Sequence, residues 1–112
     1  MGRRLRSILT DDFDTCYLCG KTLGPGMREI HHVFGGANRD NSEKHGLIVP
    51  LCHNCHNEPP LGVHHNKGRR LKLQAEAQNE FEREYSFAEF MGIFGRDYIE
   101  TYKAWREEEG LV

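Results

Sequence analysis

The sequence lacks any long hydrophobic run. None of its 112 residues falls in an apolar stretch of about 18, the length at which a membrane-spanning helix becomes a candidate. The apolar stretch that follows the N-terminal arginines is also far too short for the hydrophobic region of a secretory signal peptide. We therefore expect a cytoplasmic protein without membrane contact, in a compartment where thiols stay reduced.

The sequence is also poor in apolar residues. Hydrophobic residues make up 38% of the chain, glycine occupies 12 positions, and there is one tryptophan. A core of this size stabilises a domain only modestly, so a bound structural metal would contribute much to folding. We find no internal repeat and no low-complexity segment, and the length predicts a single domain over residues 1–112.

A strong net charge is missing as well, since the formal charge is -2. The charges are nevertheless segregated: residues 1–72 contain 11 Lys/Arg and 7 Asp/Glu, whereas residues 73–112 contain 4 and 10. All seven histidines lie between His31 and His65, within the basic part. This part is the candidate surface for a phosphate backbone. An ordinary division between a basic half and an acidic helical face explains the charges equally well.

The four cysteines form two CxxC pairs, Cys16/Cys19 and Cys52/Cys55. Zinc prefers four such ligands in a tetrahedron, and a glycine directly after Cys19 suits the turn of a zinc knuckle. Two disulfides are the alternative in a secreted protein, but the spacing and a reducing compartment favour metal. We predict a structural zinc, because four thiolates leave no open coordination position for catalysis.

The residue pattern predicts an α+β fold. Apolar and β-branched residues indicate two strands separated by a polar loop, and helix-forming segments follow. Ser86 and Glu89 match the capping box of one of these helices. We expect a core over about residues 16–58 and a helical extension over about 66–109. The expected elements are a strand over 28–34, a loop over 35–42, a strand over 47–51, a short helix from about 53 that ends by Pro59-Pro60, and helices over 67 or 69 to 85, 86–94 and 97–108.

Three segments near the cysteines carry a family resemblance. They are Glu29-Ile30-His31-His32-Val33, Gly35-Gly36 and Leu47-Ile48-Val49-Pro50-Leu51-Cys52-His53-Asn54-Cys55-His56. With the first CxxC pair, they make about residues 16–57 resemble the HNH endonucleases of the ββα-metal class, in particular the small stand-alone HNH proteins of phages and prophages. The resemblance implies a zinc-stapled ββα-metal core with two or three additional C-terminal helices. It also implies a metal-dependent DNA endonuclease that hydrolyses phosphodiester bonds in a bacterial cytoplasm.

The resemblance assigns roles to the histidines. His32 matches the general base that deprotonates the attacking water, and His31 and His56 match ligands of a catalytic divalent metal. His64 is a further candidate ligand, with a plain surface histidine as the alternative. Neighbours in a strand point to opposite faces, so His31 can bind metal while His32 acts as base. Glu29 shares the face of His31 and could orient an imidazole through its second nitrogen.

One departure from the family concerns its central asparagine, because Gly46 stands where it would be expected. Asn38 or Asn41 could take over by bonding backbone across the loop, and we place Asn41 among the site residues. Arg39, in the same loop, is the candidate clamp for the scissile phosphate. The expected DNA-contacting residues are Arg39, Lys67, Arg69 and Arg70, with Arg3, Arg4, Arg6 and Lys72 as further candidates, and ordinary solubilising charge is the alternative for each.

Two kinds of metal are expected. One is a structural Zn2+, and the other is a catalytic divalent ion. A histidine-rich site favours Zn2+, Ni2+ or Mn2+ for the second, and Mg2+ could serve with added waters.

The expected partner is DNA, contacted mostly through its backbone, with a homodimer or a phage recombination or packaging partner as additional expectations. The alternative function is a zinc-finger nucleic-acid-binding module. A further alternative is a partner-dependent, recombination-associated nuclease with little activity alone.

Overall fold

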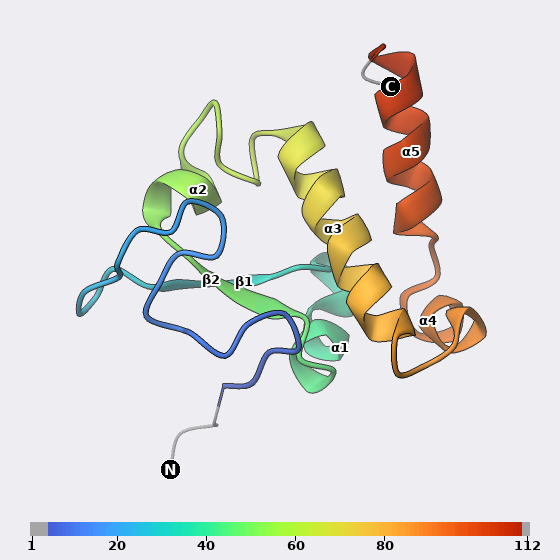
Figure 1. Cartoon of the computed structure of the whole chain (residues 1–112), viewed down its shortest axis with the longest axis horizontal. Coiled ribbons are helices and arrows are strands. Elements are labelled where there is room, and N and C mark those ends of the chain that lie inside the picture. Colours follow the sequence, from blue (N-terminus) through green and yellow to red (C-terminus); the bar gives the residue numbers. More distant parts are fainter. Residues whose placement is uncertain (1–4, 111–112) are drawn as a thin grey trace.

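The computed structural model describes residues 5–110, which form a two-stranded sheet flanked by helices (Figure 1). The mixed α/β class and the strand, strand, helix order of the core are as predicted. Within this range, no helix is both long and apolar enough to cross a membrane. Arg3 and Arg4, two expected phosphate contacts, lie outside the described residues. The elements are β1 (Glu29–His32), the 3-10 helix η1 (Gly36–Asn38), α1 (Arg39–Lys44), β2 (Ile48–Leu51), α2 (His53–Asn57), α3 (Lys67–Glu82), α4 (Phe87–Phe94) and α5 (Tyr98–Glu108).

The two strands form an antiparallel hairpin in which Ile30 pairs with Pro50 and His32 pairs with Ile48. All four residues of β2 are buried, as its apolar sequence requires. Pro50 has no N–H to donate, but its carbonyl accepts a hydrogen bond from the backbone N–H of Tyr17 (2.9 Å). This bond ties the first CxxC segment to the strand that leads directly into the second.

The connection between the strands differs from the predicted polar loop, because η1 and α1 occupy it. The buried hydroxyl of Ser42 accepts from the backbone N–H of Phe34 (3.0 Å) and donates to the carbonyl of the same residue (2.7 Å). The expectation that Asn38 or Asn41 would bond backbone across the loop to hold the strands is therefore wrong. Asn41 donates to the Asn38 side chain (3.2 Å), and Asn38 donates to the carbonyl of Phe94 in α4 (3.3 Å). Ser42 thus joins the connection between the strands to the backbone of Phe34.

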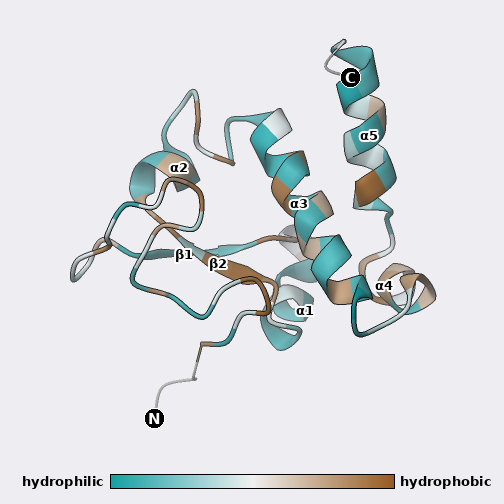
Figure 2. Ribbon diagram, in the orientation of Figure 1, coloured by the Kyte–Doolittle hydropathy of each residue, from teal (hydrophilic) through white to brown (hydrophobic). Residues whose placement is uncertain are grey.

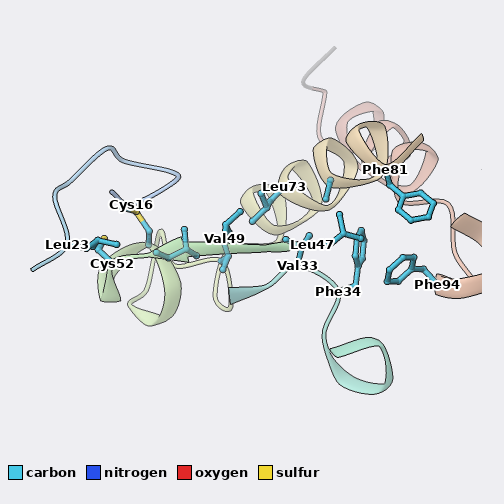
Figure 3. Close-up of a cluster of buried hydrophobic side chains, with 14 of the residues drawn as sticks. Cys16, Leu23, Val33, Phe34, Leu47, Val49, Cys52, Leu73, Phe81 and Phe94 are labelled. Atoms are coloured by element: carbon cyan, nitrogen blue, oxygen red, sulfur yellow. The ribbon is translucent and has the colours of Figure 1, made fainter. Parts of the chain in front are cut away.

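The hydrophobic core follows the hairpin along its length (Figure 3). Cys52 lies at one end, Leu73 of α3 covers the middle, and an aromatic group closes the other end. In that group the ring centroids of Phe34 and Phe94 are 4.8 Å apart, and Phe81 lies 6.2 Å from Phe94. Hydrophobic residues concentrate in β2 and α4 (Figure 2). The core thus links the cysteine end of the hairpin to the C-terminal helices.

The helical extension is present as predicted, with α3 ending three residues earlier than expected. α3 ends at Glu82, and after a turn Ser86 adopts the extended conformation of an N-cap residue and forms the predicted capping box of α4 with Glu89. α5 packs along α3, and Trp105 lies directly over Gly68. A Cβ added at Gly68 would come within 2.5 Å of the indole, so a glycine is needed at this contact.

Candidate metal centres

The four cysteines come together as one cluster, with all their sulfur atoms within 4.8 Å of one another. No disulfide joins them. The Sγ atoms of Cys19 and Cys52 are 3.8 Å apart. In a tetrahedral site with Zn–S bonds of about 2.3 Å, neighbouring sulfurs lie about 3.8 Å apart. The donor set and its spacing therefore fit the predicted structural zinc.

Two backbone turns place the cysteines. Gly20 donates its N–H to the carbonyl of Cys16 (2.9 Å) and has a φ of 79°, a conformation that glycine adopts without a side-chain clash. Cys52 is the N-cap residue of α2, and Cys55 lies inside that helix. The first pair thus forms the predicted knuckle, and the second pair begins a helix.

The protonation of the thiols supports a cation at this cluster. Cys16, Cys52 and Cys55 are buried. Burial, together with the hydrogen bond to Cys52, raises the pKa of Cys55 to about 12. Burial also opposes ionisation of Cys16, but backbone hydrogen bonds at Cys19 and Cys52 lower its pKa to about 7. Four thiolates cannot coexist here without a positive charge between them, and a divalent metal would supply that charge.

A second cluster combines His31 of β1, His56 of α2 and His64 of the following loop, with ligand nitrogens within 4.8 Å of one another. The Nε2 atoms of His56 and His64 are 3.0 Å apart. The ring centroid of His31 lies 5.1 Å from that of His56 and 5.2 Å from that of His64. The backbone N–H of His64 donates to the carbonyl of His56 (3.3 Å), which fixes the loop against α2. The structure therefore brings together the three histidines that the sequence analysis selected as metal ligands.

His31 is the most buried histidine of this cluster, with an exposed fraction of 4%. Neither of its ring nitrogens has a hydrogen-bond partner among residues 5–110. Burial, and then the nearby charge of His56, lowers the pKa of His31 to about 3, so the ring is neutral. A buried polar nitrogen without a partner costs free energy, and a metal ion bound to its lone pair removes that cost. Three imidazole ligands suit a divalent transition metal and leave coordination positions open.

Glu29 orients His56, the second histidine of the cluster, through a hydrogen bond to its Nδ1. The Nδ1–H of His56 (2.8 Å) and the Nδ2 of Asn57 (2.9 Å) donate to its Oε1, and the Nδ1–H of His53 donates to its Oε2 (2.8 Å). Burial acts to raise the pKa of Glu29, but these three hydrogen bonds lower it. Because Nδ1 of His56 is the donor, its Nε2 carries the lone pair that faces the cluster. The sequence predicts such a role for Glu29, whereas no local pattern marks its partners His53 and Asn57.

His32 contacts α1. Its Nε2 lies 3.9 Å from Oε2 of Glu43. Burial, and then the positive charge of Arg39, lowers the pKa of His32, so the ring is unprotonated at neutral pH. Arg39 is the exposed first residue of α1. Glu43 was not a sequence candidate, because the helix that carries it was expected to be a loop.

Arg70 of α3 lies beside the histidine cluster. Its Nη1 donates to the carbonyl of Val63 (3.1 Å), one residue before His64. Burial is the largest cause of the lowered pKa of His31 and of His64, and the charges of neighbouring histidines add to it. The positive charge of Arg70 lowers both pKa values further. The guanidinium is thus close enough to the cluster to act on an anion bound there.

The other expected DNA-contacting residues of α3 lie in its first turn. Lys67 is exposed. Arg69 is half-buried, and its Nη1 donates to the carbonyl of Leu61 (2.7 Å). This turn places three cations near the loop that carries His64.

The chain matches no protein-family model, no curated protein and no solved structure in the three comparisons that we made.

Proposed function

We propose that this protein is a divalent-metal-dependent DNA endonuclease of the HNH type. The observation that supports this most is the cluster of His31, His56 and His64, in which His31 has two buried and unpartnered ring nitrogens. His32 follows His31 directly at the end of β1. A three-imidazole site leaves room for a substrate, whereas the four-cysteine site is closed. The two clusters therefore suit a catalytic and a structural ion respectively.

In this proposal His32 takes the proton of the attacking water. Its lowered pKa keeps Nε2 free to accept a proton at neutral pH, as a general base requires. The carboxylate of Glu43, 3.9 Å away, stabilises the imidazolium that forms after the transfer. Glu43 thus acts as a positioning residue for the base.

The remaining residues bind the phosphodiester. Arg39 beside His32 and Arg70 beside the histidine cluster supply positive charge for the scissile phosphate. His31, His56 and His64 would hold the metal. When bound, a divalent ion stabilises negative charge on the phosphate and on the leaving oxygen.

Plasmid cleavage tests the proposal. Supercoiled DNA is incubated with the protein and Mn2+, Mg2+, Ni2+ or Zn2+ in separate reactions, and with EDTA as the blank. We expect nicked or linear product with at least one metal. The variant His32→Ala should cleave about 10²–10⁴ times more slowly because the base is lost. His65→Ala, which changes a neighbouring histidine outside the cluster, should cleave like the wild type.

Other outcomes would redirect the proposal. Unchanged cleavage by His32→Ala, at unchanged zinc content, would remove His32 from the mechanism. DNA binding without cleavage in any of these metals would favour a zinc-finger nucleic-acid-binding module. Cleavage that starts only when a recombinase coats the DNA would favour the partner-dependent nuclease.

A further inference from the structure

One exposed apolar side chain lies in the same loop as His64 of the histidine cluster. Leu61 is 57% exposed, the largest fraction among the exposed large hydrophobic side chains of residues 5–110. It lies in the loop of residues 58–66, which joins α2 to α3 and projects beyond both helices (Figure 1). His64 belongs to the same loop, so Leu61 sits three residues from a candidate metal ligand.

The loop has a fixed shape. The backbone N–H of Gly62 donates to the carbonyl of Glu58 (2.7 Å), and that of Val63 donates to the carbonyl of Cys55 (2.8 Å). A Cβ at Gly62 would come within 2.7 Å of backbone atoms of Glu58, so a glycine is required for this close approach. Leu61 therefore lies in a loop that is hydrogen-bonded to α2, the helix that contributes to both clusters.

Two arginines of α3 donate hydrogen bonds to backbone carbonyls of this loop. Arg69 donates from Nη1 to the carbonyl of Leu61 (2.7 Å), and Arg70 donates from Nη1 to the carbonyl of Val63 (3.1 Å). A guanidinium has five N–H donors, so each arginine can hold the loop and still contact a phosphate. Cations beside an exposed apolar tip are the combination with which proteins grip a DNA backbone and insert a side chain between base pairs.

We infer that Leu61 is a wedge that enters the base stack beside the phosphodiester to be cut. This inference rests on the proposed nuclease function and adds a substrate class to it. Insertion into an intact duplex must break a stacking contact, whereas a bulge has already lost one. The enzyme thus prefers DNA with interrupted stacking, and Leu61 accelerates cleavage of an intact duplex by opening the stack there.

Matched substrates test the wedge. One is a short, fully paired duplex, and the other has the same sequence with one unpaired nucleotide; both are incubated with the protein and Mn2+. The wild type should cleave the bulged substrate about tenfold faster. Leu61→Ala should slow cleavage of the paired duplex by about tenfold and that of the bulged duplex by less than about threefold.

Two further variants make the result specific. Leu61→Met keeps an apolar tip and should restore cleavage of the paired duplex to near the wild-type rate. Met27→Ala removes another exposed apolar side chain, 41% exposed, in the turn before β1, and should change neither rate. Zinc content and the circular dichroism spectrum of every variant show whether the fold is intact.

Each failure has its own signature. Equal slowing of both substrates by Leu61→Ala, or no slowing of either, overturns the wedge and leaves the nuclease proposal standing. The same holds if Leu61→Met fails to restore the paired-duplex rate while its zinc content is normal. If the wild type cuts neither substrate with any metal, the nuclease proposal fails, and the wedge fails with it.

Discussion

The cysteine cluster and the histidine cluster share one short helix, yet they differ in what they leave open. Three of the four cysteines are buried, and four soft ligands saturate a tetrahedral ion. The histidine cluster has three ligands, of which His31 is buried and His64 is exposed. The cysteine cluster would therefore enclose a bound ion, whereas the histidine cluster keeps one side toward solvent.

The two clusters depend on successive residues of α2. Cys55 belongs to the first and His56 to the second. The loop that follows is bonded to the carbonyls of both, by the N–H of Val63 (2.8 Å) and by that of His64 (3.3 Å). This arrangement indicates that the closed cysteine cluster supports the position of the open histidine cluster. Loss of the closed site should disturb both clusters, and loss of the open site should disturb only itself.

The largest expected effect follows from loss of the cysteine cluster, the closed site. Cys52→Ser removes a buried candidate ligand at the N-cap position of α2. A structural zinc contributes about 10 kcal/mol or more to the folding of small domains, which is comparable with the whole stability of a typical domain. We expect no cooperative thermal transition and no metal at either site, measured by circular dichroism and elemental analysis. A variant that melts like the wild type would contradict a structural role.

The second-largest expected effect is on metal binding at the histidine cluster, the open site. Glu29→Gln weakens the acceptor that orients His56 and should lower metal affinity there about 10–100-fold. The measurement is a titration with Co2+, whose visible absorption distinguishes thiolate from imidazole ligands. Zinc at the cysteines should be unaffected. Glu58→Gln, which removes an exposed carboxylate that contacts His53 alone among the cluster-supporting residues, serves as the control. Equal weakening by both variants would argue against orientation by Glu29.

Replacing His31 should raise the free energy of unfolding of the one-zinc form while it removes the second metal ion. His31→Leu removes two buried nitrogens that have no partner within the described part of the chain. The one-zinc form should become more stable by about 1–3 kcal/mol in urea unfolding, while the bound metal falls from two ions to one. His65→Leu is the control and should keep both ions. If His31→Leu instead destabilises the one-zinc form, His31 is a packing residue of the core.

The smallest effect lies outside both clusters. Ser42→Ala leaves the N–H and carbonyl of Phe34 without their side-chain partner, and should cost about 1–2 kcal/mol in urea unfolding. Asn41→Ala, which loses only a bond to Asn38, should cost less than about 0.5 kcal/mol. Both variants should keep two metal ions. Loss of the second ion from Ser42→Ala would show that α1 positions the histidines as well.

The cysteine cluster was predictable from spacing, because two CxxC pairs each place two sulfurs on one side of a turn. The histidine cluster was predicted from the resemblance to HNH endonucleases, which selected His31 and His56 as ligands and left His64 as a further candidate. Only part of the hydrogen-bond network around Glu29 was predictable. Its own position follows from strand alternation, but His53 and Asn57 reach it because α2 crosses the end of β1 in space.

The connection between the strands was the least predictable part. The segment of α1 has six residues, too few to show a helical period, and its glycine-rich approach favours a loop. Asp40 near the start and Lys44 at the end are the charges that a helix dipole prefers, and they were the available signal. Ser42 could not be selected, because its partners lie on the backbone of a residue eight positions away.

The contact between Trp105 and Gly68 gives the chain an optical probe of its own. This is the sole tryptophan in the sequence, and its indole rests on the first turn of α3, immediately before Arg69 and Arg70. Indole emission depends on the polarity around the ring. Any ligand that shifts those two arginines should therefore change the intrinsic fluorescence, without a label and without turnover.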